Sequence, residues 1–435
     1  MRRRARKGGG RQLTLEIGAL GGKGDGIGTH DGRPVFVPQT LPGERLIARV
    51  TAEKSGGWRG EAIELLTRSA DRVEPPCPHF GPCGGCSLQH LEPAAYRRWK
   101  RGLAVEALSR QGFLGDRVAD LQSVGDRGRR RAVFAAHHAG NAVAMGFHRR
   151  MSHNVVDLRS CLVVAPSHFA LLDPLRELLA RLIAPGETGD VAVLDTETGP
   201  DILLISKRAP ALEGREAAAA FASQTGVARI SWAGSVGEEP ELLAQHCLPV
   251  VRFGGIAVTP PPGGFLQPTA DGEAMLRTAV LDGLGPEDRR VADLYAGCGT
   301  FTFPIVTDEG GGRSVVAVEG DSPALQALSR AARTAGIGSE VTAVERDLAR
   351  QPLLTEELNA FDAVVFDPPR AGASEQSREL AQSKVRHVVA VSCNPASLAR
   401  DLRILTEGGY ALDWVRPIDQ FPWTPHLELV ARLSR

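Results

Sequence analysis

The sequence predicts an α/β protein. Its C-terminal part is expected to form a doubly wound parallel sheet, preceded by a small β-barrel and a central mixed α/β segment. Two observations carry this prediction. From Val291 onward, short apolar runs alternate with segments of helical periodicity, which is typical of repeated β-α units. Between residues 12 and 66, apolar and polar residues alternate and are interrupted by glycine-rich turns, which is typical of short antiparallel strands.

The N-terminal barrel is predicted over residues 12 to 66. Leu13, Leu15 and Ile17 alternate with polar residues, a glycine-rich turn follows, and the alternation then resumes. Residues 1 to 11 precede the barrel as a basic arm, which we expect to be disordered.

A central segment is predicted over residues 69 to 262. Apolar residues between Glu92 and Phe113 have helical spacing, and the arginines of this stretch fall on the other face. We expect this helix to pack on the C-terminal domain, which is predicted over residues 263 to 435. Beyond residue 125 no catalytic pattern stands out, so we assign the rest of the segment to substrate handling.

Composition and charge restrict the class of protein. The chain of 435 residues is 43% hydrophobic and 23% charged, so two or three cored domains are expected and a membrane protein is not. No apolar run follows the basic start, and the expected location is the cytoplasm. Lysine plus arginine equals aspartate plus glutamate at 51 each, so only local basic clusters can indicate a nucleic-acid partner. These clusters are Arg2, Arg3, Arg4, Arg6 and Lys7; Arg97, Arg98, Lys100 and Arg101; Arg127, Arg129, Arg130 and Arg131; and Arg149 and Arg150.

The first strand of the predicted C-terminal sheet ends in the glycine-rich turn DLYAGCG, residues 293 to 299. Glycines at a strand-to-helix turn let a ligand approach the backbone closely. An adenosine cofactor fits this turn, whereas the dinucleotide fingerprint needs a third glycine where Thr302 stands. Glu319 ends the second strand and can accept hydrogen bonds from ribose hydroxyls, and Asp347 follows the third strand.

Two further strands end in side chains that can do chemistry. FDAVVF is followed by Asp367 and Pro-Pro-Arg, and HVVAVS is followed by Cys393 and Asn-Pro. Because the carboxyl ends of parallel strands share one edge, both side chains are expected at the ligand crevice. Cys393 precedes a helix that starts near Pro395, so we expect the helix dipole to favour its thiolate. An inert buried cysteine is the alternative.

Three of the seven cysteines crowd together at Cys77, Cys83 and Cys86. Seven cysteines in a chain of this length do not suggest a disulfide framework. In a reducing compartment their crowding indicates a metal site.

Across nearly the whole chain, these residues resemble the uracil-C5 RNA methyltransferase family, which contains 23S rRNA and tRNA enzymes. DLYAGCGTFTFP, DPPRAG, SCNPASLARDL and PHLELVARL occur in the family order. The resemblance implies a Rossmann-like class I methyltransferase domain that uses S-adenosylmethionine, and it makes residues 12 to 66 similar to the RNA-binding TRAM barrel. The cofactor-binding residues that it implies are Gln267, Tyr295, Gly297, Thr300, Glu319, Asp347 and Asp367.

The resemblance places Cys393 on the family's nucleophile and Glu428 on its general base. A thiolate that adds to C6 of uracil raises the electron density at C5, which can then accept the methyl group. C5 still carries its proton, so a carboxylate must remove that proton before the cysteine leaves. Thr269 and Thr300 depart from the family pattern, which commonly has asparagine at both positions.

Cys77, Cys83 and Cys86, together with Cys161, look like the four-cysteine iron-sulfur site found in part of this family. Four thiolates can hold zinc or a [4Fe-4S] cluster, and the resemblance favours the cluster, in a structural role. The barrel and the cysteines look more like the 23S rRNA members than the tRNA members. We therefore expect 23S rRNA as substrate and tRNA as the alternative, with a monomer favoured.

Two other functions compete with this interpretation. An amino-group methyltransferase is suggested by Asp367-Pro-Pro, which resembles an acidic motif that holds an exocyclic amine, but Arg370 follows where an aromatic residue is usual. That function would also leave Cys393 and Glu428 unused. A noncatalytic RNA-binding protein or iron-sulfur sensor would need a decayed fold, and the intact nucleophile, base and cofactor turn argue against decay.

Overall fold

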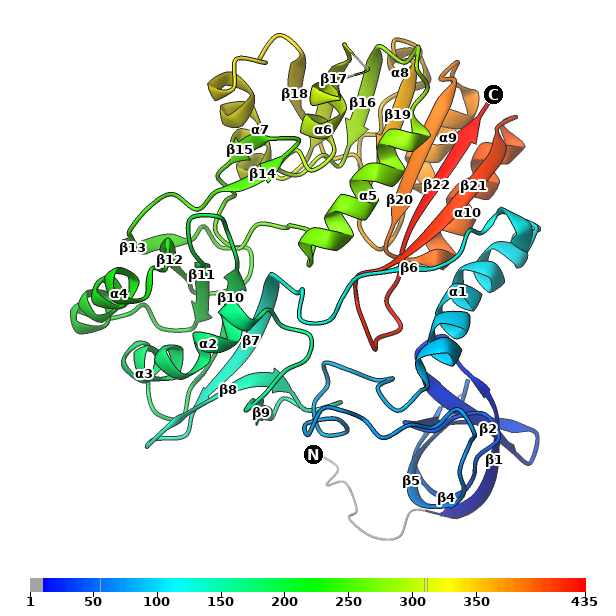
Figure 1. Ribbon diagram of the computed structural model, residues 1–435, viewed down its shortest axis with the longest axis vertical. Helices are drawn as coiled ribbons and strands as arrows, with labels where there is room; N and C mark the ends of the chain where they lie inside the picture. The colour runs from blue at the N-terminus through cyan, green and yellow to red at the C-terminus, as the bar shows by residue number, and fades with distance from the viewer. Residues whose placement is uncertain (1–10, 55, 309, 311) are drawn as a thin grey trace, which may run out of the picture. The chain divides into compact units, whose positions relative to one another are not determined.

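The computed structural model describes residues 11–54, 56–308, 310 and 312–435 (Figure 1). The predicted basic arm lies outside the described residues except for Arg11. The chain divides into two compact units, one containing the residues up to Leu103 with Trp423–Pro425, and the other containing Ala104–Pro422 with His426–Arg435. Each unit has apolar clusters of its own.

The first unit contains a closed barrel with the strand order β1-β2-β3-β5-β4. Leu13, Leu15 and Ile17 point into it while the residues between them are exposed, as their alternation predicted. The small N-terminal barrel is therefore confirmed. Its strands are β1 (Gln12–Leu20), β2 (Asp25–His30), β3 (Arg33–Pro38), β4 (Arg45–Lys54) and β5 (Gly57–Thr67).

The helix that follows the barrel is α1 (Pro93–Ser109). Tyr96 packs with Leu41, Leu88 and Leu91 in an apolar cluster. Lys100 is fully buried and donates a hydrogen bond to the Tyr96 hydroxyl at 2.7 Å. The prediction of a basic cluster open to a nucleic acid is therefore wrong at Lys100, because its ammonium group lies inside the protein.

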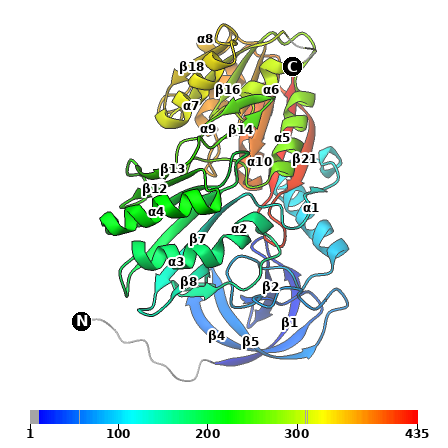
Figure 2. The ribbon, with the colours of Figure 1, turned by 60° about the vertical axis from the view of Figure 1, so that its left-hand side comes forward.

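The central part of the second unit is a sheet with the order β13-β12-β11-β10-β7-β8-β9, in which only β11 and β12 pair in parallel among the described strands. Figure 2 shows α3 and α4 side by side in front of this sheet, where they contact each other. A hairpin, β14-β15, leads out of the segment. The elements are β7 (Arg131–His138), β8 (Val143–His148), β9 (Val155–Asp157), α2 (Pro166–Ala170), α3 (Leu172–Leu182), β10 (Thr188–Leu194), β11 (Asp201–Ser206), α4 (Leu212–Thr225), β12 (Arg229–Ala233), β13 (Glu241–Gln245), β14 (Val251–Phe253) and β15 (Ile256–Val258).

The C-terminal sheet has the order β18-β17-β16-β19-β20-β22-β21-β6. The neighbouring strands β18, β17, β16, β19 and β20 pair in parallel, which confirms the predicted doubly wound core. The sequence did not reveal that β22 runs antiparallel between β20 and β21, or that β6 joins the edge. The strands are β6 (Gln122–Ser123), β16 (Arg290–Leu294), β17 (Ser314–Glu319), β18 (Val341–Glu345), β19 (Ala363–Phe366), β20 (His387–Ser392), β21 (Ala411–Asp419) and β22 (Glu428–Ser434).

Helices cover both faces of this sheet, which explains why its strands are apolar throughout. Val291, Val365 and Val389 point towards α5 and α6, and α5 lies in front of the sheet in Figure 1. The neighbouring residues along each strand point to the opposite face, where α9 and α10 pack. No helix in the described part of the chain is long and apolar enough to cross a membrane. The helices are α5 (Ala270–Gly283), α6 (Thr302–Thr307), α7 (Ser322–Thr334), α8 (Thr355–Leu358), α9 (Ser374–Gln382) and α10 (Pro395–Glu407).

Candidate active site

The turn from β16 to α6 has the shape of a ligand-binding loop. Tyr295, Gly297 and Gly299 adopt positive φ angles of 62°, 55° and 96°. A Cβ atom at Gly297 would meet no atom within 4 Å, whereas one at Gly299 would lie 2.5 Å from the Phe303 ring. Gly297 therefore leaves its backbone open to a ligand, and Gly299 lets α6 close against the turn. Thr300 is half-buried in the same turn.

The Glu319 carboxylate at the end of β17 faces this turn. One oxygen accepts the Gly297 N–H at 2.9 Å, and the other accepts the N–H groups of Gly320 and Asp321 at 2.6 and 2.7 Å. These bonds fix the carboxylate, and its oxygens retain lone pairs for further donors. Asp347 is exposed after β18, in a loop next to Gly320, whose Cβ would lie 3.5 Å from the Asp347 Cα atom.

Asp293, near the end of β16, carries a buried acceptor without a donor. Thr302 donates its hydroxyl to one oxygen at 2.5 Å, while the other oxygen has no hydrogen-bond partner among the described residues. The pKa of Asp293 is raised to about 7, chiefly by burial. Asp367 and Glu319 contribute to this rise, and the hydrogen bond from Thr302 opposes it. Such an oxygen suits a ligand with a cationic amino group. In the sequence Asp293 was only the first residue of the glycine turn.

Asp367, Cys393 and Glu428 come together at one edge of the sheet. Asp367 follows β19, Cys393 follows β20, and Glu428 begins β22. The β20-β22 register pairs Ser392 with Leu429, so the next position places Cys393 opposite Glu428. The two carboxylates both act electrostatically on the Cys393 thiol.

The thiol of Cys393 is held in its protonated form. Its pKa is raised to about 11, chiefly by burial and also by Glu428 and Asp367, while Arg370 opposes the rise. The expectation that helix α10 favours the thiolate is therefore wrong for the ligand-free protein, because burial and two carboxylates outweigh the helix end. Asn394, the residue after the cysteine, caps α10 by accepting the Ala396 N–H at 3.2 Å.

Two amide side chains connect these carboxyl groups. Gln267 donates Nε2 to Asp367 Oδ2 at 3.3 Å, and Gln420 donates Nε2 to Gln267 Oε1 at 2.7 Å. Burial raises the pKa of Glu428, Asp367 raises it further, and a hydrogen bond from Gln420 lowers it. Sequence reasoning missed Gln420, because a polar residue directly after an apolar strand is usually a solvated loop residue.

The Gln267 segment is held by the central part of the same unit. Arg130 donates Nε to the Gln267 carbonyl at 3.2 Å and forms an ion pair with the buried Glu273 of α5. Thr269 caps α5, since its hydroxyl accepts the Gly272 N–H at 3.0 Å. Arg130, which was predicted to belong to a basic cluster, thus connects the Gln267 segment to α5 inside the protein. Thr269, the first position that departs from the family pattern, serves as a helix cap.

The four candidate metal ligands are divided between the two units. Cys77, Cys83 and Cys86 lie half-buried in a loop of the first unit, and Cys161 belongs to the second. Backbone N–H groups point at the Cys83 and Cys161 sulfurs, at 3.4 and 3.5 Å. Among the described residues no three His, Cys, Asp or Glu side chains lie close enough together to hold a metal ion.

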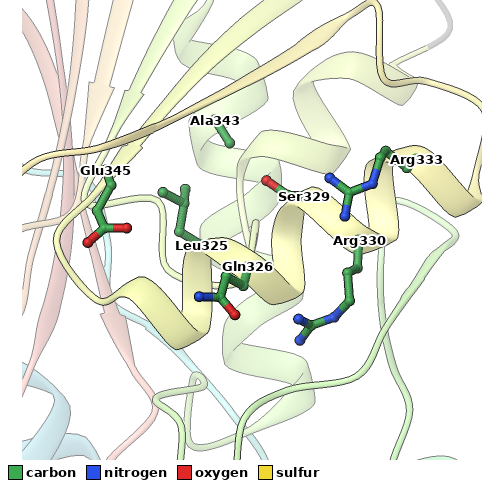
Figure 3. Close-up of a pocket in the computed structure, with 7 residues that line it drawn as sticks. All are labelled: Leu325, Gln326, Ser329, Arg330, Arg333, Ala343 and Glu345. Carbon is green, nitrogen blue, oxygen red and sulfur yellow. The ribbon is translucent and has the colours of Figure 1, made fainter.

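A pocket of about 450 Å³ lies between α7 and β18 (Figure 3). Arg330 and Arg333 line it from α7, and Glu345 lines it from the end of β18. It contains none of the predicted site residues, so it is distinct from the cluster of side chains at the strand ends.

Comparison with known proteins identifies the family. Residues 258–435 match the family described as tRNA (Uracil-5-)-methyltransferase, and residues 7–63 match the TRAM domain. The chain is 36% identical to 23S rRNA (uracil(1939)-C(5))-methyltransferase RlmD of Chromohalobacter salexigens, over 97% of this chain and 89% of that protein. This chain belongs to the RNA uracil-C5 methyltransferase family. Its membership makes it an S-adenosylmethionine-dependent RNA methyltransferase.

One further relative agrees with this chain in length, and one solved structure agrees with it in fold. A protein of Rhizobium meliloti named "Uncharacterized RNA methyltransferase" is 41% identical over 97% of this chain and 99% of its own. The crystal structure of Pyrococcus abyssi tRNA (uracil-54, C5)-methyltransferase, in complex with S-adenosyl-L-homocysteine, superposes with a TM-score of 0.72, covering 97% of this chain and all of that one at 21% identity. The predicted fold class is therefore confirmed.

Proposed function

We propose that the protein methylates C5 of a uridine in 23S rRNA, with Cys393 as nucleophile and Glu428 as general base. The observation that carries the proposal is the convergence of Cys393, Glu428 and Asp367 at one sheet edge beside the cofactor turn. The relative from Chromohalobacter salexigens is named for 23S rRNA, which favours that substrate. A tRNA uridine is the alternative.

The residues of the turn fit S-adenosylmethionine. The unpartnered, buried oxygen of Asp293 would accept a hydrogen bond from the amino group, and Glu319 would accept the ribose hydroxyls. Gly297 leaves room for the ligand at the backbone, and Tyr295, Thr300 and Asp347 lie in this turn and in the loop after β18. When bound, the cofactor supplies the electrophilic methyl group.

Cys393 starts the reaction by adding to C6 of the uracil. Because its pKa lies near 11, the thiol must release its proton to solvent before the thiolate attacks, and Arg370 favours that release. The addition moves electron density to C5. Gln267 and Asp367, which are joined by a hydrogen bond, position the uracil.

Glu428 completes the reaction by removing the C5 proton. The C5–H electron pair forms the C5–C6 double bond, and the bond between C6 and the Cys393 sulfur breaks. This requires the ionised carboxylate, which the Gln420 hydrogen bond favours against burial and Asp367.

The barrel supplies a basic surface for RNA outside the reacting groups. Arg11 and Arg33 place their guanidinium groups 5.5 and 5.7 Å from the Trp58 ring centroid. The target uridine would leave its stack to reach Cys393, since a stacked base cannot present C6 to a thiol. Because both candidate substrates are cytoplasmic RNAs, we propose that the protein acts in the cytoplasm.

We also propose that Cys77, Cys83, Cys86 and Cys161 bind a [4Fe-4S] cluster, with zinc as the alternative. The proposal rests on the resemblance and on the four thiols, two of which receive backbone N–H groups. Protein purified without oxygen should contain iron and acid-labile sulfide and show the visible absorption of a cluster. Zinc in their place would select the alternative.

The main test is methylation with labelled S-adenosylmethionine. We would incubate the protein with separate unmodified 23S rRNA and tRNA transcripts and locate the modified nucleoside by mass spectrometry. 5-Methyluridine in rRNA supports the proposal, and the same nucleoside in tRNA selects the alternative substrate. Cys393→Ala should abolish the activity, and a methylated amine, or an active Cys393→Ala variant, would refute the covalent mechanism.

A further inference from the structure

Gln420 is a fully buried amide directly after β21, and it lies between two groups of the proposed reaction. Its Nε2 donates to Gln267 Oε1 at 2.7 Å. The β21-β22 register pairs Ile418, two residues before Gln420, with Glu428, and the Gln420 side chain lowers the pKa of that carboxyl by hydrogen bonding. In the proposed mechanism Gln267 binds the uracil and the cofactor, and Glu428 removes the C5 proton. Gln420 is therefore the side chain that connects these two functions.

The orientation of the Gln420 amide follows from its neighbours. Asp367 accepts a hydrogen bond from Gln267 Nε2. The oxygen of the same amide therefore needs a donor, and Gln420 donates its Nε2 to it. The Gln420 oxygen points to the first turn of α5, where a Cβ atom at Gly272 would lie 2.4 Å from it. This oxygen is buried and accepts no hydrogen bond from the described residues. The positive end of the α5 dipole favours an electronegative atom there, and glycine at 272 makes the space for it.

We propose that Gln420 is a positioning residue that holds the ionised carboxylate of Glu428 in place to remove the C5 proton, and that it ties this base to Gln267. This inference rests on the proposed function. The amide has two N–H groups, so it can donate to Gln267 and to Glu428 together. After proton removal Glu428 is neutral and loses the charge-assisted part of this bond, so the interaction favours the reactive form.

The titratable groups that face Glu428 disfavour the ionised form of its carboxyl group. Asp367, after β19, raises the pKa of Glu428, and Cys393, after β20, interacts electrostatically with it. Burial also raises this pKa, and the hydrogen bond of Gln420 lowers it. Removing its hydrogen bond should therefore leave Glu428 protonated over a wider range of pH.

The test is Gln420→Met, which keeps the size of the side chain and removes its hydrogen bonds. On the transcript that the wild type methylates, kcat near neutral pH should fall about tenfold, with a smaller change in KM, because base catalysis is weakened. The acid limb of the kcat profile should move to higher pH. The covalent protein–RNA complex should accumulate, because elimination of Cys393 waits for the C5 proton.

Two further variants separate positioning from packing. Gln376→Met removes another buried, hydrogen-bonded glutamine, in α9, and should change thermal stability without moving the pH profile. Gly272→Ala replaces a helical glycine with a good helix former and displaces the Gln420 amide, so it should reproduce the shifted profile even if Gln420→Met folds poorly.

The outcomes distinguish this inference from the proposed function. An unmoved acid limb in both Gln420→Met and Gly272→Ala, or a loss confined to KM, would overturn the role of Gln420 while leaving the mechanism intact. If Cys393→Ala stays active, or if no variant forms a covalent complex, the proposed function itself fails.

Discussion

At the scale of single residues, the protonated thiol of Cys393 has a direct consequence. Alkylation by iodoacetamide requires the thiolate, so Cys393 in the RNA-free protein should react slowly at neutral pH and faster as the pH rises towards its pKa of about 11. At a fixed pH above the raised Glu428 pKa of about 8, Glu428→Gln removes a neighbouring negative charge and should speed the reaction. Peptide mass spectrometry after timed labelling measures both effects.

Cys247, outside the predicted site, serves as the internal control for this experiment. Its rate of alkylation should not respond to Glu428→Gln. Rapid labelling of Cys393 at neutral pH would contradict the electrostatic account of the site and would restore the prediction that helix α10 favours the thiolate.

Asp293 should make stability depend on pH. Folding raises the pKa of Asp293 from 3.8 to about 7. Between these two pH values the folded protein binds more protons than the unfolded chain. The contribution of Asp293 to the free energy of unfolding is therefore lost as the pH rises from 3.8 to about 7. Relative to Asp293→Asn, the wild type should lose about 1.4 kcal/mol of unfolding free energy per pH unit in this window. Urea titrations at several pH values measure the difference, and a constant difference would contradict the assigned pKa.

At the scale of elements, the Arg130–Glu273 ion pair joins the strand region before β7 to helix α5. Arg130→Gln leaves the buried Glu273 carboxylate unpaired and should lower the unfolding free energy by about 3 kcal/mol. Adding Glu273→Gln should recover part of the loss. Methylation should slow as well, because the Gln267 carbonyl loses a donor.

An exposed pair provides the matched control for Arg130. Arg403 and Glu407 form an ion pair on the surface of α10, and Arg403→Gln should change the unfolding free energy by less than about 1 kcal/mol. Equal effects from Arg130→Gln and Arg403→Gln would show that the buried pair does not clamp the Gln267 segment.

The same elements show how far the sequence could predict the structure. Apolar runs specified the parallel strands, because a strand covered on both faces must be apolar throughout. The strand ends specified Asp367 and Cys393 because the order of a doubly wound sheet brings them to one edge. The antiparallel position of β22 carried no local signal, since pairing direction depends on the whole sheet.

Several polar side chains could not be predicted for a different reason. Arg130 and Lys100 were predicted to belong to basic surface clusters. Arg130 is instead half-buried against Glu273, which is distant in the sequence, and Lys100 is buried against Tyr96, one helical turn away. Gln420 had no pattern to mark it. The function of a buried polar group depends on its three-dimensional neighbours, and composition and periodicity do not record them.

At the scale of the whole molecule, the division into two units predicts a selective response to ligand. The cofactor turn, Cys393 and Glu428 all belong to the second unit. S-adenosyl-L-homocysteine at one hundred times its Kd should stabilise that unit by about 2.7 kcal/mol. Differential scanning calorimetry should then show a higher Tm for one transition only, and equal movement of both transitions would contradict the division.

The segment Trp423–Pro425 joins the first unit although it stands twelve residues or fewer from the C-terminus. Its Trp423 carbonyl accepts the N–H groups of Ser87 and Leu88 at 2.8 and 3.1 Å. During synthesis on the ribosome, the barrel strands are made first, but these bonds cannot form until residue 423 has been added. The N-terminal unit therefore cannot be completed until Trp423 has been made, so a chain truncated before this residue would lack bonds in both units.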